Sequence, residues 1–333
     1  MNLTLETAPV RLRKRSRGLM TRLGPLLGLV AVYLLFAALG PASFTSFQNL
    51  ETIARQTAIV GTAALGMTMI MIAGGIDLSV GSMIALVTVV IAALLQAGLP
   101  PLAAALLGIG AAALAGFGNG VLVTRLRIVP FIVTLGTLLL LRGAAKGLAH
   151  EQKIDAPLTS LVDLLAALPA AARWHLFPAG VWMMLLLALS VAGVLRFTKF
   201  GRHLTAVGSN ELTARLCGVP VERIKVLVYT LGGAFAGVAG LFQFSRLTVG
   251  DPTVAMGVEL DVIAAVVIGG GSLSGGEGSV LGTMVGALIM TVIRSGCSQM
   301  GLPNWVQEMV TGAIIVVAVA LDRLRHRKTE TND

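Results

Sequence analysis

Residues 72–85 read IAGGIDLSVGSMIA, and this stretch places an aspartate, two serines and three glycines between two apolar runs. Glycine clusters interrupt helices, so the stretch predicts a break between one helix and a second helix that begins near Ser79 or Val80. Asp77 can cap the second helix, because a carboxylate accepts free backbone N–H groups and is stabilised by the positive end of the helix dipole. We favour this role over direct contact with a solute, since capping alone explains an acid here.

The amino-acid composition indicates that these apolar segments lie in a lipid bilayer. Hydrophobic residues make up 56% of the 333 residues and charged residues only 12%, with a mean hydropathy of +0.87. Apolar stretches near the ~20 residues that cross about 30 Å of hydrocarbon recur along the chain. The predicted fold class is therefore all-α, a polytopic transmembrane helix bundle with about ten spans, at about residues 24–41, 57–73, 80–96, 101–123, 128–148, 177–195, 225–244, 257–269, 279–294 and 304–321.

Lysine and arginine set the predicted orientation. With the N terminus inside, most of the 25 Lys and Arg residues fall on cytoplasmic segments, as the positive-inside rule requires. They are scattered among the spans without interleaved aromatic residues, which argues for a lipid bilayer as partner and against a nucleic acid. The predicted divisions are a basic cytoplasmic N-terminal tail at 1–23, a transmembrane domain at 24–322 with a periplasmic loop at 149–176 and a cytoplasmic loop at 196–225, and a cytoplasmic C-terminal tail at 323–333.

A second glycine cluster lies late in the chain, VVIGGGSLSGGEGSVLG at 266–282. Like the first cluster, it separates two apolar runs and contains serines. Non-helical backbone inside a membrane is tolerated only where protein or a water-filled cavity covers it, and broken helices of this kind commonly border transport pathways. The predicted orientation puts both clusters on the cytoplasmic side, so they do not by themselves establish an inverted repeat, and tight turns between packed helices remain an alternative.

The sequence carries no catalytic motif. It lacks a GxxxxGK[ST] phosphate loop, an HExxH metal motif and a GxSxG nucleophile motif, and its four histidines lie in or next to predicted loops. No catalytic residue, metal site or directly bound cofactor is predicted, so any ATP and Mg would be used by another polypeptide. Charged residues inside the spans are sparse, which argues against a proton or sodium antiporter built on buried carboxylates. Asp77 is the main candidate for such an acid, with Glu259 and Asp261 as weaker ones at an outer helix start.

Weakly polar groups on apolar helices are the candidates for a solute pathway, because a polar solute needs brief hydrogen-bonding partners that do not trap it. Each has a structural alternative, since threonine can bond its own helix and amides can join neighbouring helices. For any single residue the structural role is favoured. The candidate pathway or gate residues are Gly74, Gly75, Asp77, Ser79, Asn119, Thr134, Thr137 and Gln243.

Four separated stretches then resemble one known family. They are GGIDLSVGS at 74–82, PFIVTLGT at 130–137, FGRHLTAVGSNELTARLCGVPVERIK at 200–225 and GVELDVIAAVVIGGGSLSGGEGSVLGT at 257–283. In this order they are similar to the ribose-type sugar permeases of bacterial ABC importers, over about residues 45–320. The resemblance implies a multi-pass permease subunit of the bacterial inner membrane that imports a monosaccharide or similar small polar solute by alternating access. It also implies a second permease subunit, identical or paralogous, a cytoplasmic ABC ATPase that uses ATP and Mg, and a periplasmic sugar-binding protein.

The loop at 196–225 would have a mechanical role in such a protein. Ser209 or Asn210 can cap a short helix that runs to about Cys217, and Gly218 supplies a C-terminal stop. Without the resemblance, a solvated loop whose charges only set the topology is the favoured interpretation. The resemblance implies instead a coupling helix that docks on the ATPase, with Asn210, Glu211, Ala214, Arg215, Gly218 and Val219 as the ATPase-coupling residues.

Three alternatives stay open. A branched-chain amino-acid permease of the same importer superfamily would share the late glycine-rich segment, although GGIDLSVGS fits sugar systems better. An ion-coupled secondary transporter would need coupling residues within its spans, which the sparse charge disfavours. A structural or sensory membrane subunit would leave the match in the coupling loop unexplained.

Overall fold

A computed structural model describes residues 8–169 and 175–330, with side chains described from Gly24 to Ala320 within those ranges. The described residues form mainly α-helix, together with two short 3₁₀ turns and a two-residue antiparallel ladder of β1 with β2, so the fold is mostly but not wholly helical. The elements are α1 (Ala8–Leu39), α2 (Phe47–Ile72), α3 (Val80–Gln96), α4 (Pro101–Arg125), α5 (Pro130–Leu148), β1 (Ile154–Asp155), α6 (Ala179–Phe197), α7 (Lys199–Ser209), α8 (Glu211–Leu216), α9 (Val221–Leu247), β2 (Val249–Gly250), α10 (Val258–Ile268), α11 (Val280–Gln299) and α12 (Asn304–Glu330).

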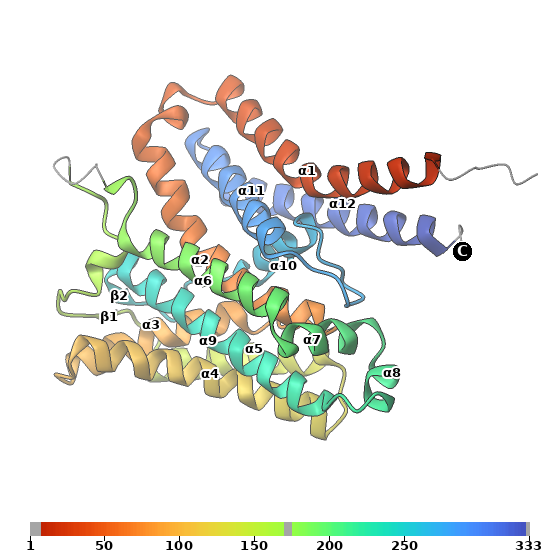
Figure 1. The fold of residues 1–333 in the computed structure, drawn as a ribbon. Coiled ribbons are helices and arrows are strands. Elements are labelled where there is room, and N and C mark those ends of the chain that lie inside the picture. The colour runs from red at the N-terminus through yellow and green to blue at the C-terminus, as the bar shows by residue number, and fades with distance from the viewer. Residues whose placement is uncertain (1–7, 170–174, 331–333) are drawn as a thin grey trace, which may run out of the picture.

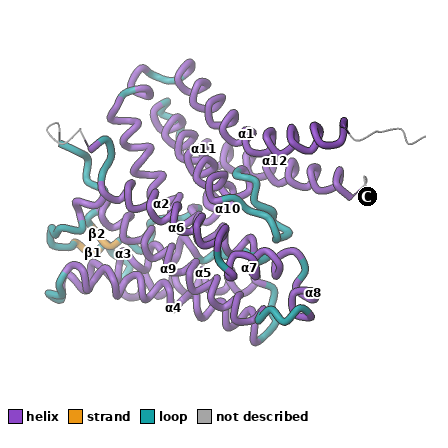
Figure 2. Tube along the Cα trace, in the orientation of Figure 1, coloured by secondary structure: helices purple, strands orange, loops and turns teal. Residues whose placement is uncertain are grey.

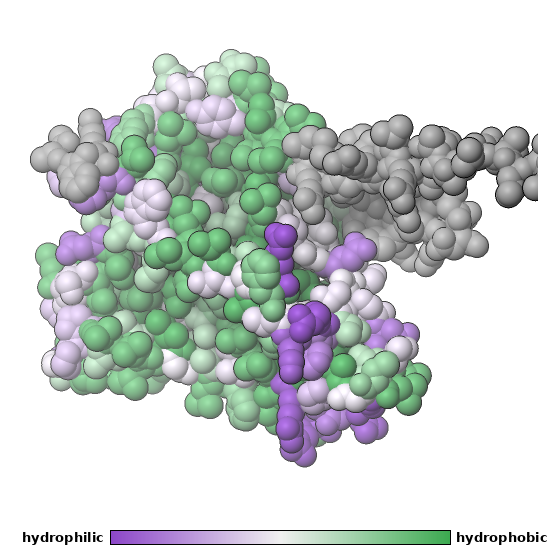
Figure 3. Space-filling model, viewed as in Figure 1, coloured by the Kyte–Doolittle hydropathy of each residue, from purple (hydrophilic) through white to green (hydrophobic). Residues whose placement is uncertain are grey.

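Helices run between two ends of the molecule. One end carries β1 and β2, and we call it the strand end; the other carries α7 and α8, and we call it the α8 end (Figure 1). The loops gather mostly at these two ends (Figure 2), and the visible surface between them is largely hydrophobic, with hydrophilic residues gathered at the α8 end and fewer at the strand end (Figure 3). Among the described helices, α2, α4, α5, α6, α9 and α11 are long and apolar enough to cross a membrane, and shorter apolar helices lie at Gly24–Leu39, Val80–Gln96 and Asn304–Ala320.

The start of α1 and the end of α12 lie on the same side of the molecule as α8 (Figure 1). The cytoplasmic location of both ends, and the number of ten spans, stay predictions. Helix α1 begins at Ala8 and α12 continues to Glu330, so helix extends into both predicted tails. Residues 1–7 and 331–333 of those tails, and residues 170–174 of the predicted periplasmic loop, lie outside the described residues.

Helix α2 is the centre of the bundle, and most of its length is buried between α9, α11, α10 and α6. Helices α4 and α9 make the most extensive contact between described helices, and glycines on both helices lie in it. A Cβ atom at Gly116 would collide with the Tyr229 carbonyl oxygen and lie 3.0 Å from the Gly233 Cα atom. Small residues allow this contact where lipid provides no hydrophobic drive for helix packing.

Several helix boundaries differ from those predicted. Helix α3 spans the predicted residues 80–96, but α2 begins at Phe47, ten residues before the predicted start. Polar side chains in this first part of α2 made it look unlike a membrane span. In the structure these side chains are buried and form hydrogen bonds with backbone groups. Asn49 donates to the Phe44 carbonyl oxygen at 2.8 Å, and Glu51 accepts from the Leu168 amide at 2.8 Å. The predicted loop at 196–225 also holds a separate helix, α7, that the sequence did not indicate.

Candidate functional site

The stretch between α2 and α3 is the break that the sequence predicted. Helix α2 ends at Ile72, and the Gly75 amide donates back to the Ile70 carbonyl oxygen at 2.9 Å. Gly74 has a φ of +77°, a conformation that side chains disfavour. Gly75 packs against the Tyr229 side chain so closely that a Cβ atom would lie 2.5 Å from the phenolic oxygen. The chain therefore needs both glycines to turn beneath α9.

Asp77 is fully buried and bonds to the residue before α3. Its Oδ1 atom accepts from the Ser79 backbone amide at 2.8 Å and from the Ser79 hydroxyl at 2.5 Å. Ser79 itself occupies the N-cap position of α3, and its side chain does not bond to the first turn. Asp77 therefore does not cap α3 directly. It accepts hydrogen bonds from the N-cap residue and does not bond to the amides within the helix.

Side chains from two further helices complete a buried polar cluster around this break. The Asn119 amide of α4 donates to the Ser79 hydroxyl at 3.0 Å. The Tyr229 hydroxyl of α9 donates to the Ile76 carbonyl oxygen at 3.3 Å. The Thr134 hydroxyl of α5 lies between two carbonyl oxygens, at 3.3 Å from that of Ile76 and at 2.9 Å from that of Pro130 in its own helix, so its single proton is shared between them. The structure therefore brings four of the predicted residues together, Asp77, Ser79, Asn119 and Thr134. We call these four residues, together with Ile76 and Tyr229, the break cluster.

Two atoms in the break cluster lack a partner. Within the described residues, Asp77 Oδ2 and Asn119 Oδ1 are buried and make no hydrogen bond. An unsatisfied buried polar atom costs free energy, about 1–3 kcal/mol. A cluster with spare acceptors between α3 and α4 can receive hydrogen bonds from a hydroxylated solute or from water when the helices move apart.

Besides Gly74 and Gly75 of the break itself, two predicted pathway residues lie outside the cluster. The Thr137 hydroxyl donates to the Thr134 carbonyl oxygen of its own helix at 3.2 Å, which is the structural alternative stated for threonine. Gln243 follows Tyr229 by fourteen residues on α9, which places it roughly 21 Å further along the helix toward the strand end. Tyr229 was not predicted, although it is one of only two tyrosines in the chain and lies in an apolar run.

The short helix predicted within residues 196–225 is confirmed as α8. Asn210 is its N-cap residue and accepts from the Thr213 amide at 2.8 Å, while Ser209 bonds instead to the Thr205 carbonyl oxygen in α7. After α8, Gly218 has a φ of +81°, and the Val219 amide donates to the Ala214 carbonyl oxygen at 3.0 Å. These bonds give α8 a defined start and a defined stop.

Charges tie α8 to the first turn of α9. Lys225 lies 2.6 Å from a carboxylate oxygen of Glu211, and Arg215 lies 3.0 Å from Glu222. The hydrogen bond from Lys225 lowers the pKa of the Glu211 carboxyl below its usual value, so this carboxylate is charged at neutral pH. Leu212 and Leu216 share one face of α8 and are 69% and 80% exposed. An exposed apolar face on a helix at the hydrophilic end of the molecule suits contact with another protein.

Glycines join the end of α7 to both glycine-rich stretches. The Gly276 amide donates to the Ile72 carbonyl oxygen at 2.9 Å, which links the late stretch to the last residue of α2. A Cβ atom at Gly208 would collide with the same carbonyl oxygen and lie 2.6 Å from the Gly276 nitrogen. A Cβ atom at Gly275 would lie 2.9 Å from Gly74 Cα. We call Gly74, Gly208, Gly275 and Gly276 the glycine junction.

Two buried acids are paired with basic residues. Asp261 is 1% exposed and lies 2.6 Å from Arg294, and Asp251 is 7% exposed and lies 3.2 Å from Lys153. Asp251 lies between two predicted spans, and Asp261 is one of the candidate acids named from the sequence, so neither contradicts the prediction that charge inside the spans is sparse. Asp261 does lie in the first turn of a helix, α10, as predicted.

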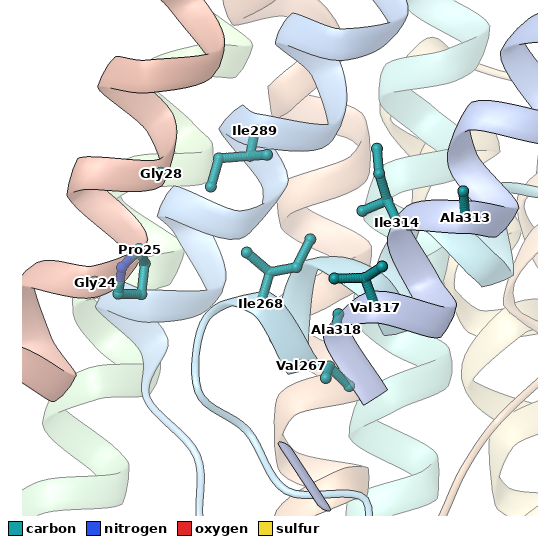
Figure 4. A pocket seen from close by; sticks show the side chains of 10 residues that line it. All are labelled: Gly24, Pro25, Gly28, Val267, Ile268, Ile289, Ala313, Ile314, Val317 and Ala318. Atoms are coloured by element: carbon teal, nitrogen blue, oxygen red, sulfur yellow. The ribbon is translucent and has the colours of Figure 1, made fainter. Parts of the chain in front are cut away.

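A cavity of about 410 Å³ lies elsewhere, between α1, α10, α11 and α12 (Figure 4). Its side chains are apolar, among them Val267, Ile268, Ile289 and Ile314. A cavity without polar side chains offers few partners to a hydroxylated solute. We therefore do not include it in the candidate site.

Removing the cap of α8 is expected to loosen this helix. Asn210→Ala removes the acceptor of the Thr213 amide, which costs about 1 kcal/mol, a large share for a helix of only 6 residues. We expect hydrogen exchange of the amides after residue 211 to accelerate about fivefold and solute uptake to fall several-fold. Ser209→Ala is the matched control, since its hydroxyl bonds only within α7. Equal exchange in the two variants would contradict the assignment of the cap.

Comparison with known proteins matches most of the chain. The family model for the branched-chain amino acid transport system / permease component matches residues 49–319. The chain is 38% identical to the ribose import permease protein of Bacillus subtilis (strain 168), over 92% of this chain and 94% of that protein. It is 35% identical to a fructose import permease protein of Rhizobium meliloti, over 90% and 84%, and 33% identical to an L-arabinose ABC transporter permease protein of Azospirillum brasilense, over 94% and 92%.

No solved structure matches the chain at a comparable level of significance. The sequence relatives are permease subunits of ABC importers, and the helices of the chain are long and apolar enough for a multi-pass membrane protein. The family model covers well over half of the chain, and the matched residues include the break cluster and the glycine junction. The chain belongs to the family of ABC import permeases that includes the ribose-type sugar permeases.

Proposed function

We propose that the chain is the membrane-spanning subunit of an ATP-driven importer that carries a monosaccharide or a similar small polar solute. Two copies, or one copy and a close paralogue, would pair in the bacterial inner membrane. The α8 end would face the cytoplasm and dock on an ABC ATPase that uses ATP and Mg. The strand end would face the periplasm and receive the solute from a binding protein.

The glycine junction is the observation that carries this proposal. The exposed Leu212 and Leu216 of α8 offer an apolar face to a partner, and α8 follows α7 directly. The end of α7 touches Ile72 and Gly276 without room for a Cβ atom. A displacement of α7 and α8 is therefore passed to the end of α2 and to the late glycine-rich stretch at once, as rigid packed elements require. Alternating access needs this kind of link between a partner and the helices around the pathway.

The break cluster supplies the gate in this proposal. It holds the start of α3 against α4, α5 and α9 through single hydrogen bonds at 3.0 to 3.3 Å. Such bonds can be exchanged for bonds to a solute hydroxyl when the helices tilt. Low affinity of the permease for the solute would follow, since the cluster has few polar groups and, within the described residues, only Asp77 Oδ2 and Asn119 Oδ1 are free to accept a hydrogen bond.

One observation favours a second candidate, an ion-coupled transporter. Asp77 is a fully buried acid in a broken helix, with one oxygen that makes no hydrogen bond within the described residues. Acids in such places serve as coupling groups in ion-driven carriers. The name of the family model also keeps a branched-chain amino acid as an alternative solute.

Uptake into proteoliposomes tests these functions against each other. The vesicles would hold this protein, its ATPase and its binding protein, with ATP sealed inside, and would be offered radiolabelled pentoses, hexoses and branched-chain amino acids. We expect one sugar to accumulate only with ATP and to do so in the presence of a protonophore. Uptake that ignores ATP and stops with the protonophore would reject the importer, and ATP-dependent uptake of an amino acid would change the solute.

A further inference from the structure

Helix α10 is too short to cross a membrane. Its 11 residues span about 16 Å, roughly half of the ~30 Å hydrocarbon core. Figure 1 shows β2 at the strand end and α10 near the middle of the molecule, so the chain between them must enter the bundle before α10 begins. We call residues 251–257 the re-entrant segment.

Contacts with α3 show how deep the re-entrant segment lies. At its start, the Asp251 amide donates to the Thr88 hydroxyl at 3.2 Å. At its far end, a Cβ atom at Gly81 would collide with the Ala255 carbonyl oxygen and with the Glu259 carboxylate. Thr88 and Gly81 are seven residues apart on α3, so the segment descends by roughly 10 Å from the level of Thr88. It ends at the first turn of α3, directly after the break cluster.

One face of the segment is bonded to the bundle. Arg142 of α5 donates to the Pro252 carbonyl oxygen at 2.9 Å and to the Val254 carbonyl oxygen at 2.7 Å. Asp251 Oδ1 accepts from the amide and the hydroxyl of Thr253 at 2.8 and 2.7 Å. These bonds satisfy the polar groups that face α3 and α5.

The other face is exposed. Met256 is 59% exposed and Leu260, one turn further on in α10, is 45% exposed. Within the described part of the chain, the backbone amides of Ala255 and Met256 make no hydrogen bond. An unpaired amide in hydrocarbon costs several kcal/mol, and non-helical backbone at membrane depth is found only against protein or along a water-filled cavity. This face therefore does not contact lipid.

We propose that the re-entrant segment and the first turn of α10 form a wall of the aqueous solute path, with Met256 and Leu260 facing the solute. The inference deepens the proposed function and rests on it. Water satisfies the free amides while the path is empty, and hydroxyl groups of a passing solute replace that water. The apolar side chains pack against the C–H faces of the solute, so their size selects among solutes of similar polarity.

Labelling of single cysteines tests this assignment. Cys217 and Cys297 are free thiols, so a background with Cys217→Ser and Cys297→Ala removes both. Met256→Cys is then compared with Leu140→Cys, an exposed position on α5 two residues before Arg142 and so at a similar depth. Leu260→Cys is a second test position if Met256→Cys does not fold. The reagent is a positively charged methanethiosulfonate that does not cross membranes, applied to the complex with its ATPase in proteoliposomes.

We expect Met256→Cys to react at least tenfold faster than Leu140→Cys, with a rate that changes at least threefold when the ATPase is trapped with vanadate. A rate no faster than that of Leu140→Cys would overturn the proposal. The proposal would also be overturned if Met256→Cys did not react with the reagent and if oxidation joined two copies of this variant by a disulfide. That result would assign this face to the contact between subunits. Labelling does not require transport, so the two proposals can fail separately. If Met256→Cys is labelled as expected but the proteoliposomes show no ATP-driven uptake, the importer function is rejected and the position of the segment is not.

Discussion

Gly208→Ala is expected to lower solute uptake at least tenfold while the complex with the ATPase still assembles and hydrolyses ATP. The added Cβ atom would collide with the Ile72 carbonyl oxygen and lie 2.6 Å from the Gly276 nitrogen, and these two atoms are joined by a hydrogen bond. Because all three positions are backbone, no side chain can move aside. Helix α7 must shift, which separates the ATPase-facing helices from the end of α2.

The measurement is the number of ATP molecules hydrolysed per solute imported. A variant that is only unstable would lose both activities together, whereas a variant with a broken link would hydrolyse ATP with little uptake. Gly193→Ala on α6 is the matched control, because a Cβ atom there would meet nothing within 4 Å. Wild-type uptake and an unchanged ratio in Gly208→Ala would show that the glycine junction carries no movement.

Local rules predicted the elements whose partners lie nearby in the sequence. The start of α3 and the cap of α8 at Asn210 both depend on residues within three positions, and both were predicted. The join between α7 and the two glycine-rich stretches could not be predicted this way. It brings Gly208 against residues more than sixty positions away on either side, and glycine has no side chain whose chemistry would indicate a partner.

The errors have the same origin. Asn49 and Glu51 made the first part of α2 look like a loop, because their partners in the 3₁₀ turn before α2 and in the loop after α5 are visible only in three dimensions. Nothing in the sequence indicated that Arg142 would bond to the re-entrant segment, because the two are more than a hundred residues apart. Four of the eight predicted pathway residues bond within one cluster: Asp77, Ser79, Asn119 and Thr134. Tyr229 was not predicted, because its partner, the Ile76 carbonyl oxygen, is known only from the structure.

Asp77→Leu is expected to abolish uptake, whereas Asp77→Asn is expected to retain at least a third of it. The aspartate acts through one oxygen, which accepts from the amide and the hydroxyl of Ser79. Asparagine keeps an acceptor oxygen of the same geometry. Leucine has a similar size but no acceptor, so it leaves a buried N–H group unpaired at the start of α3, at a cost of about 1–3 kcal/mol. Because Ser79 also bonds Asn119, the loss reaches α4.

The pair of variants separates a positioning role of Asp77 from ion coupling. If the carboxylate only orients Ser79, Asp77→Asn imports the solute with ATP and without effect of a protonophore, and its melting temperature stays near that of the wild type. If the carboxylate carries a proton or binds a cation, Asp77→Asn folds normally but no longer accumulates solute, since an amide does neither. The second result would contradict the gate that we derive from the break cluster. The melting temperature of Asp77→Asn must therefore be measured together with its uptake. An unfolded variant would indicate a lost hydrogen bond, whereas a folded variant without uptake would indicate a lost ion site.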